Sequence, residues 1–235
     1  MSAMLQVHEI QQYHGSSHTL RNVSLSVNQG ECLALLGRNG VGKTTLLNCL
    51  MGVQSVASGT VALDGRDITS LAPHARAVLG MAYVPQGREI FARLTVEENL
   101  LMGMATKPAA RARQIKQEIF DLFPVLKTML GRRGGDLSGG QQQQLAIARA
   151  LLAEPRLIIF DEPTEGIQPS IIKDIGRVIR MLRDRGDMAI VLCEQYFDFA
   201  HELADRFLVL SRGEVVASGD QSEMNSPEVR RFLAV

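Results

Sequence analysis

The segment from Gly37 to Thr44 has the pattern G-x-x-x-x-G-K-T. Glycines at this spacing let backbone N–H groups converge on phosphate oxygens without side-chain clashes. A helix that begins here would add the partial positive charge of its N-terminus. In this pattern the lysine reaches the β- and γ-phosphates of a nucleotide and the next hydroxyl binds Mg²⁺, so these roles fall to Lys43 and Thr44. The alternative is a glycine-rich turn between a strand and a helix that binds no ligand.

A pair of acids forms the second candidate for chemistry. Asp161 and Glu162 follow the apolar residues 157–160, which read as a buried strand. In open α/β sheets, ligands gather at the carboxyl ends of the strands. Asp161 would support Mg²⁺ there through water, and Glu162 would orient or deprotonate an attacking water. Strands that end in acids by chance are common, so the prediction of nucleotide hydrolysis depends on the combination with the phosphate loop.

These residues need a sheet to bring them together, and the sequence predicts one. Residues 31–36 are mostly apolar and stop at the phosphate loop, as a buried parallel strand would, and residues 44–51 read as the following helix. Further strands are predicted at 81–84 and 189–193, with a helix at 171–182 before the latter. Alternating strands and helices predict an α/β fold whose mostly parallel sheet is covered on both faces.

Two regions depart from this alternation. Residues 5–10 and 23–27 alternate apolar and polar side chains, which is typical of half-buried antiparallel strands. The region from Thr95 to about residue 130 is predicted to be a helical lobe, with Thr95 as a helix cap. Its second helix has an apolar face within 111–123 and should end at the proline that follows.

Composition limits the class of protein. The 235 residues suit one large α/β domain or two small lobes, and the net charge of +0 gives no general attraction to nucleic acid or anionic lipid. No apolar run approaches the ~20 residues that span a bilayer. We expect no signal peptide in the first residues, because a basic segment and a long apolar segment are both missing there. Cys32, Cys49 and Cys193 are expected to be buried, reduced thiols.

The segment Leu-Ser-Gly-Gly-Gln at 137–141 adds the most specific signal. Ser138 is a plausible N-cap for a helix that continues to residue 152, and a bare Ser-Gly-Gly is otherwise only a helix start. Between a phosphate loop and an apolar run that ends in Asp161, however, this motif marks the ATP-binding cassette (ABC) family, which the whole chain resembles. The resemblance implies one ABC ATPase domain over 1–235, a P-loop NTPase nucleotide-binding domain. It implies a RecA-like core with an antiparallel β part (1–86 and 138–235) and an inserted helical subdomain (about 87–137).

The resemblance also implies roles for individual residues. Tyr13, expected on the loop after the first strand, matches the aromatic that stacks on adenine, a contact worth ~1–3 kcal/mol for bases; simple surface packing is the alternative. Gln86 matches the glutamine that touches Mg²⁺ and senses the membrane partner. Ser138, Gly139 and Gly140 would contact the γ-phosphate bound to a second subunit, again through a helix N-terminus.

Two positions depart from the family pattern. Gln168 stands where most members have an aspartate, and Gln195 where most have a histidine. Glutamine can donate to and accept from a γ-phosphate, but it cannot carry a proton's charge as histidine can. Slow hydrolysis, asymmetric pairing with a different ATPase and unchanged activity are all compatible with these replacements.

Taken with the resemblance, the residues above give a complete predicted site for the cofactors ATP and Mg²⁺. The catalytic residues are Lys43, Glu162 and Gln195. The residues that bind the nucleotide are Tyr13, Gly37, Asn39, Gly40, Val41, Gly42, Lys43, Thr44, Thr45, Gln86, Ser138, Gly139, Gly140, Gln141 and Asp161. The metal-binding residues are Thr44, Gln86 and Asp161.

Both departures resemble one branch of the family, the second ATP-binding subunit of the branched-chain amino acid importers. Within this branch, three stretches resemble the urea importer's second ATPase subunit more closely, and amino acid importers more often have glutamate where Gln86 stands. The predicted function is therefore to power uptake of urea or short amides, with a branched-chain amino acid importer as the alternative. The stretches are 83–91, 131–144 and 165–169. They contact no transported solute, so the assignment is one of resemblance alone.

The resemblance implies a two-stroke mechanism and a set of partners. Two ATP molecules would be held between two cassettes, closing the dimer until hydrolysis opens it, while the helical lobe moves with a permease loop. The partners would be a sister ATPase in a heterodimer, or a second copy in a homodimer, two permease subunits and, indirectly, a periplasmic solute-binding protein, but no nucleic acid. The chain would lie peripherally on the cytoplasmic face of the inner (plasma) membrane.

Two alternatives come from other classes. Soluble ABC proteins that act on DNA or ribosomes usually have two cassettes, a long coiled coil or a basic excess, and none of these is visible in the sequence. A partner that binds ATP but barely hydrolyses it would fit Gln168 and Gln195, but Glu162 argues against it.

Overall fold

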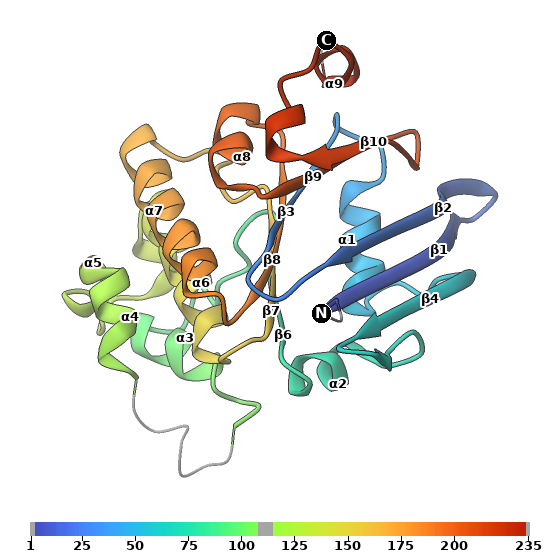
Figure 1. The fold of residues 1–235 in the computed structure, drawn as a ribbon. Helices are drawn as coiled ribbons and strands as arrows, with labels where there is room; N and C mark the ends of the chain where they lie inside the picture. The colour runs from blue at the N-terminus through green and yellow to red at the C-terminus, as the bar shows by residue number, and fades with distance from the viewer. Residues whose placement is uncertain (1–2, 108–114, 234–235) are drawn as a thin grey trace.

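The computed structural model describes residues 3–107 and 115–233 and contains two sheets (Figure 1). A six-stranded sheet has the order β10-β9-β3-β8-β7-β6, in which β9, β3, β8, β7 and β6 are parallel and β10 is antiparallel to β9. Its strands are β3 (Cys32–Leu36), β6 (Met81–Val84), β7 (Leu157–Asp161), β8 (Ala189–Glu194), β9 (Arg206–Ser211) and β10 (Glu214–Asp220). The mostly parallel α/β sheet predicted from the sequence is therefore confirmed.

A second sheet is antiparallel and lies beside the first. Its order is β2-β1-β4-β5. Its strands are β1 (Leu5–His14), β2 (Ser17–Val27), β4 (Ser58–Leu63) and β5 (Arg66–Asp67). The two predicted antiparallel strands are confirmed, and both are longer than the alternating pattern indicated.

Helices cover both faces of the central sheet (Figure 1). The α-helices are α1 (Lys43–Met51), α2 (Pro73–Val78), α3 (Val96–Met102), α4 (Gln117–Leu122), α5 (Pro124–Lys127), α6 (Gly139–Leu152), α7 (Pro169–Arg185), α8 (Phe197–Leu203) and α9 (Pro227–Leu233). The described residues also form two 3-10 helices, η1 (Gly134–Asp136) and η2 (Gln221–Glu223). None of the helices within the described ranges is long and apolar enough to cross a membrane.

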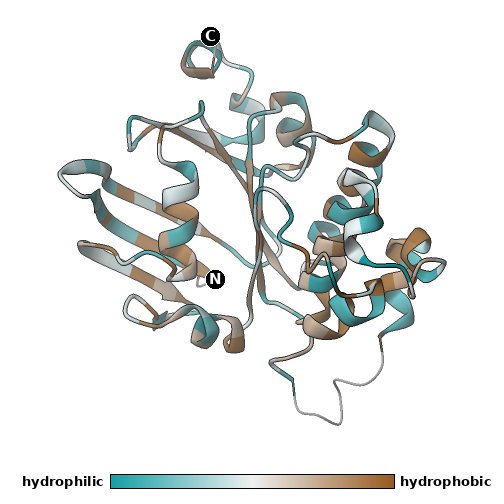
Figure 2. Cartoon of the chain, turned by 180° about the vertical axis from the view of Figure 1, so that it is seen from behind, coloured by the Kyte–Doolittle hydropathy of each residue, from teal (hydrophilic) through white to brown (hydrophobic). Residues whose placement is uncertain are grey.

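The central strands are apolar on both faces because each face packs on a separate core. In β7, Ile158 and Phe160 pack with α6 and α7, whereas Leu157 and Ile159 pack with α1 and the antiparallel sheet. Figure 2 shows hydrophobic residues concentrated along these strands. Continuous apolar runs of this kind are typical of strands buried on both sides.

In the helical region, the cap of the first helix was predicted correctly from the sequence, whereas the start of the second helix was not. Thr95 forms the predicted capping box with Glu98 at the start of α3. The helix predicted within 111–123 ends before Pro124, as expected, but its start is wrong: residues 115 and 116 are not helical, α4 covers Gln117–Leu122, and Pro124 is the first residue of α5. Proline lacks the N–H that a helix interior needs, so it starts a new turn here. Residues 111–114 lie outside the described part of the chain.

Strand order decides which loops meet. Because β3 lies beside β8, β8 beside β7 and β7 beside β6, the carboxyl ends of these four strands share one edge. The segments that leave this edge begin at Gly37, Gln195, Glu162 and Pro85. Cys32, Cys49 and Cys193 are buried free thiols, as predicted.

Candidate functional site

The phosphate loop connects β3 to α1, and its backbone depends on glycine. Gly37, Gly40 and Gly42 have φ values of 149°, 76° and 108°, in the region that favours glycine. At Gly37 a Cβ atom would lie 2.4 Å from the carbonyl oxygen of Leu210 on β9, so the loop can pass β9 only without a side chain. The loop is therefore shaped by its close backbone contact with β9.

Lys43 is the first residue of α1, and its side chain turns back into the loop. The ammonium group donates hydrogen bonds to the carbonyl oxygens of Gly37 (2.8 Å) and Arg38 (3.0 Å). It also lies 3.4 Å from Glu162 Oε1. The lysine therefore stands at the centre of the loop, where the phosphates of a nucleotide would replace these partners.

Asp161 ends β7 and is almost completely buried, with 1% of its surface exposed. Its Oδ2 accepts a hydrogen bond from the Tyr83 hydroxyl at 3.0 Å, while Oδ1 has no hydrogen-bond partner in the described part of the chain. Burial raises the pKa of Asp161, and the nearby donor groups of Cys193, Tyr83 and Thr44 oppose this shift. A buried carboxylate oxygen without a partner next to a threonine hydroxyl fits Mg²⁺, which prefers oxygen ligands.

Glu162 follows Asp161, and its carboxylate contacts Lys43, Gln195 and Gln86. Gln195 Nε2 donates to its Oε1 at 2.6 Å, and Gln86 Nε2 lies 3.4 Å from its Oε2. Gln195 Nε2 also donates to Asn39 Oδ1 in the phosphate loop, at 2.6 Å. The structure thus brings four predicted residues, Lys43, Glu162, Gln195 and Asn39, into one connected group.

Gln86 was also predicted to bind the metal. Its side chain contacts Glu162 and Glu165, and no hydrogen bond joins it to Asp161 within the described residues. Its second hydrogen bond goes to Glu165 Oε2, at 3.0 Å. Asp161, Glu162 and Cys193 instead form a compact group whose ligand atoms lie within 4.8 Å of one another. The thiol of Cys193 is a softer ligand than Mg²⁺ prefers. Burial also raises the pKa of Cys193 well above its usual value, which keeps the thiol protonated.

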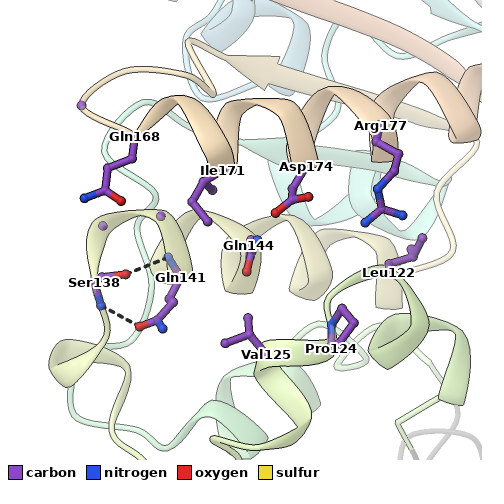
Figure 3. Close-up of a pocket in the computed structure, with 13 residues that line it drawn as sticks. Leu122, Pro124, Val125, Ser138, Gln141, Gln144, Gln168, Ile171, Asp174 and Arg177 are labelled. Carbon is purple, nitrogen blue, oxygen red and sulfur yellow. Dashed lines mark hydrogen bonds between the residues drawn. The ribbon is translucent and has the colours of Figure 1, made fainter.

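The segment 138–141 lies elsewhere in the molecule. Ser138 caps α6 in a capping box with Gln141, whose side chain accepts a hydrogen bond from the Ser138 N–H at 3.0 Å. Together with Gly139 and Gly140 these residues line a cavity of about 610 Å³ between α5, α6 and α7 (Figure 3). The phosphate loop contributes no residue to the lining of this cavity. Contact of this segment with the γ-phosphate held by a second subunit stays a prediction.

Tyr13 is placed differently from the prediction. It lies inside β1, paired with His18 of β2, and not on a loop after the strand. Its ring stacks on that of His18 with centroids 4.3 Å apart, and 47% of the residue is exposed. Thr19, which follows His18 in β2, approaches the phosphate loop: its carbonyl oxygen would lie 3.3 Å from a Cβ atom on Gly42. The aromatic ring is thus exposed on the strand pair that adjoins the loop.

Two residues of the site, Tyr83 and Glu194, were not predicted from the sequence. Tyr83 holds Asp161, and Glu194, which ends β8, accepts hydrogen bonds from Thr164, Gln195 and Tyr196. The signal for Glu194 was present, because it follows an apolar strand as Asp161 does. No local pattern marks Tyr83, whose role depends on the neighbouring strand.

Known proteins are similar to this chain in sequence and in fold. The ABC transporter family model matches residues 20–165. The high-affinity branched-chain amino acid transport ATP-binding protein BraG of Pseudomonas aeruginosa is 39% identical over 228 residues, 97% of each chain. The probable branched-chain amino acid transport ATP-binding protein LivF of Archaeoglobus fulgidus is 39% identical over 207 residues, 88% of each chain. Among solved structures, the ADP conformation of MJ1267, an ATP-binding cassette of an ABC transporter, aligns with a TM-score of 0.84 at 27% identity and covers 99% of this chain and 98% of that chain.

The fold and the phosphate-loop site define a nucleotide-binding cassette. With the family model and these relatives, the chain belongs to the ABC transporter family. It is an ATP-binding subunit, an ATPase coupled to transport.

Proposed function

We propose that this chain powers a branched-chain amino acid importer by hydrolysing ATP. Support comes from BraG and LivF, two relatives named for this transport, the first aligned over 97% of each chain. Urea import, which was the function predicted from the sequence, has no such support, because neither of these two relatives is named for it. It becomes the second candidate, because it depends on sequence stretches that contact no solute.

One observation carries the catalytic part of the proposal. Lys43, Glu162 and Gln195 are joined around the phosphate loop by contacts of 2.6–3.4 Å. Lys43 would hold the β- and γ-phosphates, and Glu162 would orient and deprotonate the attacking water. Gln195 would donate to the γ-phosphate while it holds Glu162. Thr44 and Asp161 would hold Mg²⁺, which neutralises charge on the phosphates. Tyr13 would stack on the adenine.

The separate position of residues 138–141 supports a dimer. They line a cavity to which the phosphate loop contributes no residue, and a second cassette would present them to the bound nucleotide. A sister ATPase or a second copy of this chain would supply that cassette. Residues 87–137 would then act as the helical subdomain that moves with one of two permease subunits, at the cytoplasmic face of the membrane.

The test is ATP hydrolysis by the transporter reconstituted with its permeases and solute-binding protein. We expect leucine to stimulate phosphate release and urea to leave it unchanged. Stimulation by urea alone would transfer the chain to the second candidate. If neither solute acts in an assembled complex, both importer assignments are wrong. The Glu162→Gln variant gives the background rate, which we expect to be near zero.

A further inference from the structure

Glu194 is a buried carboxylate at the end of β8, with 2% of its surface exposed. Its Oε1 accepts hydrogen bonds from the backbone N–H and the hydroxyl of Thr164, at 3.1 and 2.7 Å. Its Oε2 accepts from the backbone N–H groups of Gln195 and Tyr196, at 3.0 and 3.2 Å. No ion pair accompanies it within residues 3–107 and 115–233, so these donors alone hold the charge.

Burying the carboxylate of Glu194 costs free energy, because the charge loses its contacts with water. A buried charge needs hydrogen bonds on both oxygens to offset its loss of water. Burial raises the pKa of Glu194, and its hydrogen bonds from Thr164, Tyr196 and Gln195 oppose the shift. An ionised carboxylate only accepts hydrogen bonds, so it matches a set of donors, whereas the NH₂ group of a glutamine would face some of them.

The donors belong to two segments that leave neighbouring strands. Thr164 lies in the turn after β7, which is closed by a hydrogen bond from the Glu165 N–H to the Glu162 carbonyl at 3.1 Å. Glu162 itself has φ of 49°, a strained value for a residue other than glycine. Gln195 follows β8. One carboxylate therefore fixes the backbone of the turn that carries Glu162 and of the segment that carries Gln195.

The same two segments meet a second time through their side chains. Gln195 Nε2 donates to Glu162 Oε1 and to Asn39 Oδ1, both at 2.6 Å. The result is a closed ring: Glu162 contacts Gln195, the Gln195 backbone contacts Glu194, and Glu194 contacts Thr164 in the turn of Glu162. Displacement of Thr164 from Glu194 would loosen Glu162 and Gln195 together.

We propose that Glu194 is a positioning residue that holds Glu162 and Gln195 in place for ATP hydrolysis, acting through Thr164. This inference rests on the proposed roles of Glu162 and Gln195. Glu194 acts on the rate through these groups, since none of its hydrogen bonds reaches the phosphate loop. The ring meets the phosphate loop through the side chains of Gln195, on Asn39, and Glu162, beside Lys43, whereas the loop backbone has a shape of its own, so ATP binding should depend on the ring less than the rate does.

The test compares Thr164→Val with Thr164→Ser in the assembled transporter. Valine removes the hydroxyl at similar volume, and we expect kcat for ATP to fall about tenfold, with KM changed by less than about twofold, because misplaced catalytic groups slow chemistry. Serine keeps the hydroxyl and should restore a rate near that of the wild type. Glu194→Gln should lower kcat further.

Thr69→Val is the matched control. Thr69 also donates its N–H and its hydroxyl to one carboxylate, that of Asp67, at 2.8 and 2.6 Å, but at the edge of the antiparallel sheet. Its kcat should stay that of the wild type. A fall in kcat shared by Thr69→Val, or an unchanged kcat in Thr164→Val, would overturn the inference.

Glu162→Gln separates this failure from that of the proposed function. If this variant is inactive while Thr164→Val keeps the wild-type kcat, only the positioning role is wrong. If Glu162→Gln hydrolyses ATP at the wild-type rate, the proposed role of Glu162 is wrong, and the positioning role is wrong with it.

Discussion

The ammonium nitrogen of Lys43 lies 3.4 Å from Glu162 Oε1, and both side chains are almost fully buried. The two residues are far apart in the chain and come from the segments that follow β3 and β7, which meet at one edge of the central sheet although β8 lies between these strands. Lys43 also donates to two carbonyl oxygens of its own loop. The lysine is thus held in position before a nucleotide enters, so little of its side-chain order would have to be established on binding.

The first prediction concerns this lysine. We expect Lys43→Ala to lower the kcat for ATP hydrolysis at least ~100-fold, because preorganised charge at the transferring phosphoryl group typically contributes that much. Phosphate release by the assembled transporter measures the effect. Lys173→Ala, on the exposed face of α7, is the control and should retain the wild-type rate. A rate within twofold of wild type for Lys43→Ala would contradict the assigned role.

The second prediction concerns the path of the phosphate loop past β9. Gly37→Ala places a Cβ 2.4 Å from the Leu210 carbonyl oxygen at a φ of 149°. The loop must shift, so we expect the free energy of unfolding to fall by about 1–3 kcal/mol, measured by urea denaturation. At Gly131 a Cβ would meet no atom within 4 Å, and Gly131→Ala should be nearly neutral. Equal stability of the two variants would show that the loop has more room than the structure gives it.

The third prediction concerns Arg76, a guanidinium group that is 2% exposed. It donates to the carbonyl oxygens of Cys49 and Leu50 at the end of α1, and to those of Leu71 and Thr69. Arg76→Met fills similar volume but removes the donor from all four carbonyl oxygens, of which that of Cys49 keeps the N–H of Gly52. We expect a loss of at least about 2 kcal/mol in the free energy of unfolding, since each unsatisfied buried acceptor costs ~1–3 kcal/mol.

Arg66→Met, on the exposed strand β5, is the matched control for Arg76 and should leave stability unchanged. If urea denaturation gives the same midpoint for both variants, the hydrogen bonds of Arg76 contribute no net stability.

The fourth prediction is a dependence of stability on pH. Glu154 accepts hydrogen bonds from Lys107 and Lys116, which lower its pKa from 4.5 to about 2. A carboxyl whose pKa is lowered in the folded state contributes stability above its unfolded pKa and loses it as pH falls toward the folded pKa. The difference in melting temperature between the wild type and Glu154→Gln should therefore be constant above about pH 5 and shrink from pH 4.5 downward.

High salt should reduce this difference at neutral pH, because the side chains of Glu154 and Lys116 are partly exposed. A difference that grows on acidification would contradict the sign of the shift.

Several elements could be predicted closely from the sequence. The strand β6 and the cap of α6 at Ser138 match the prediction residue by residue, because proline, glycine and capping side chains act on their immediate neighbours. Predictions that needed tertiary context were less accurate. The helix expected within 111–123 starts late, and Tyr13 lies in β1, since pairing with β2 extends that strand beyond its alternating pattern.

The sequence by itself determined the chemistry of the site: a loop that can cradle phosphate, acids at the end of a buried strand, and a capped helix start at Ser138. These properties depend on residues close together in the chain, whose spacing decides backbone shape and hydrogen bonding. Only the tertiary structure decided that Gln195 reaches both Asn39 and Glu162, that Glu194 anchors Thr164, and that residues 138–141 line a cavity between α5, α6 and α7. Such contacts follow from the order β3-β8-β7. Burial of apolar strands from distant parts of the chain selects this order, and no short-range pattern encodes it.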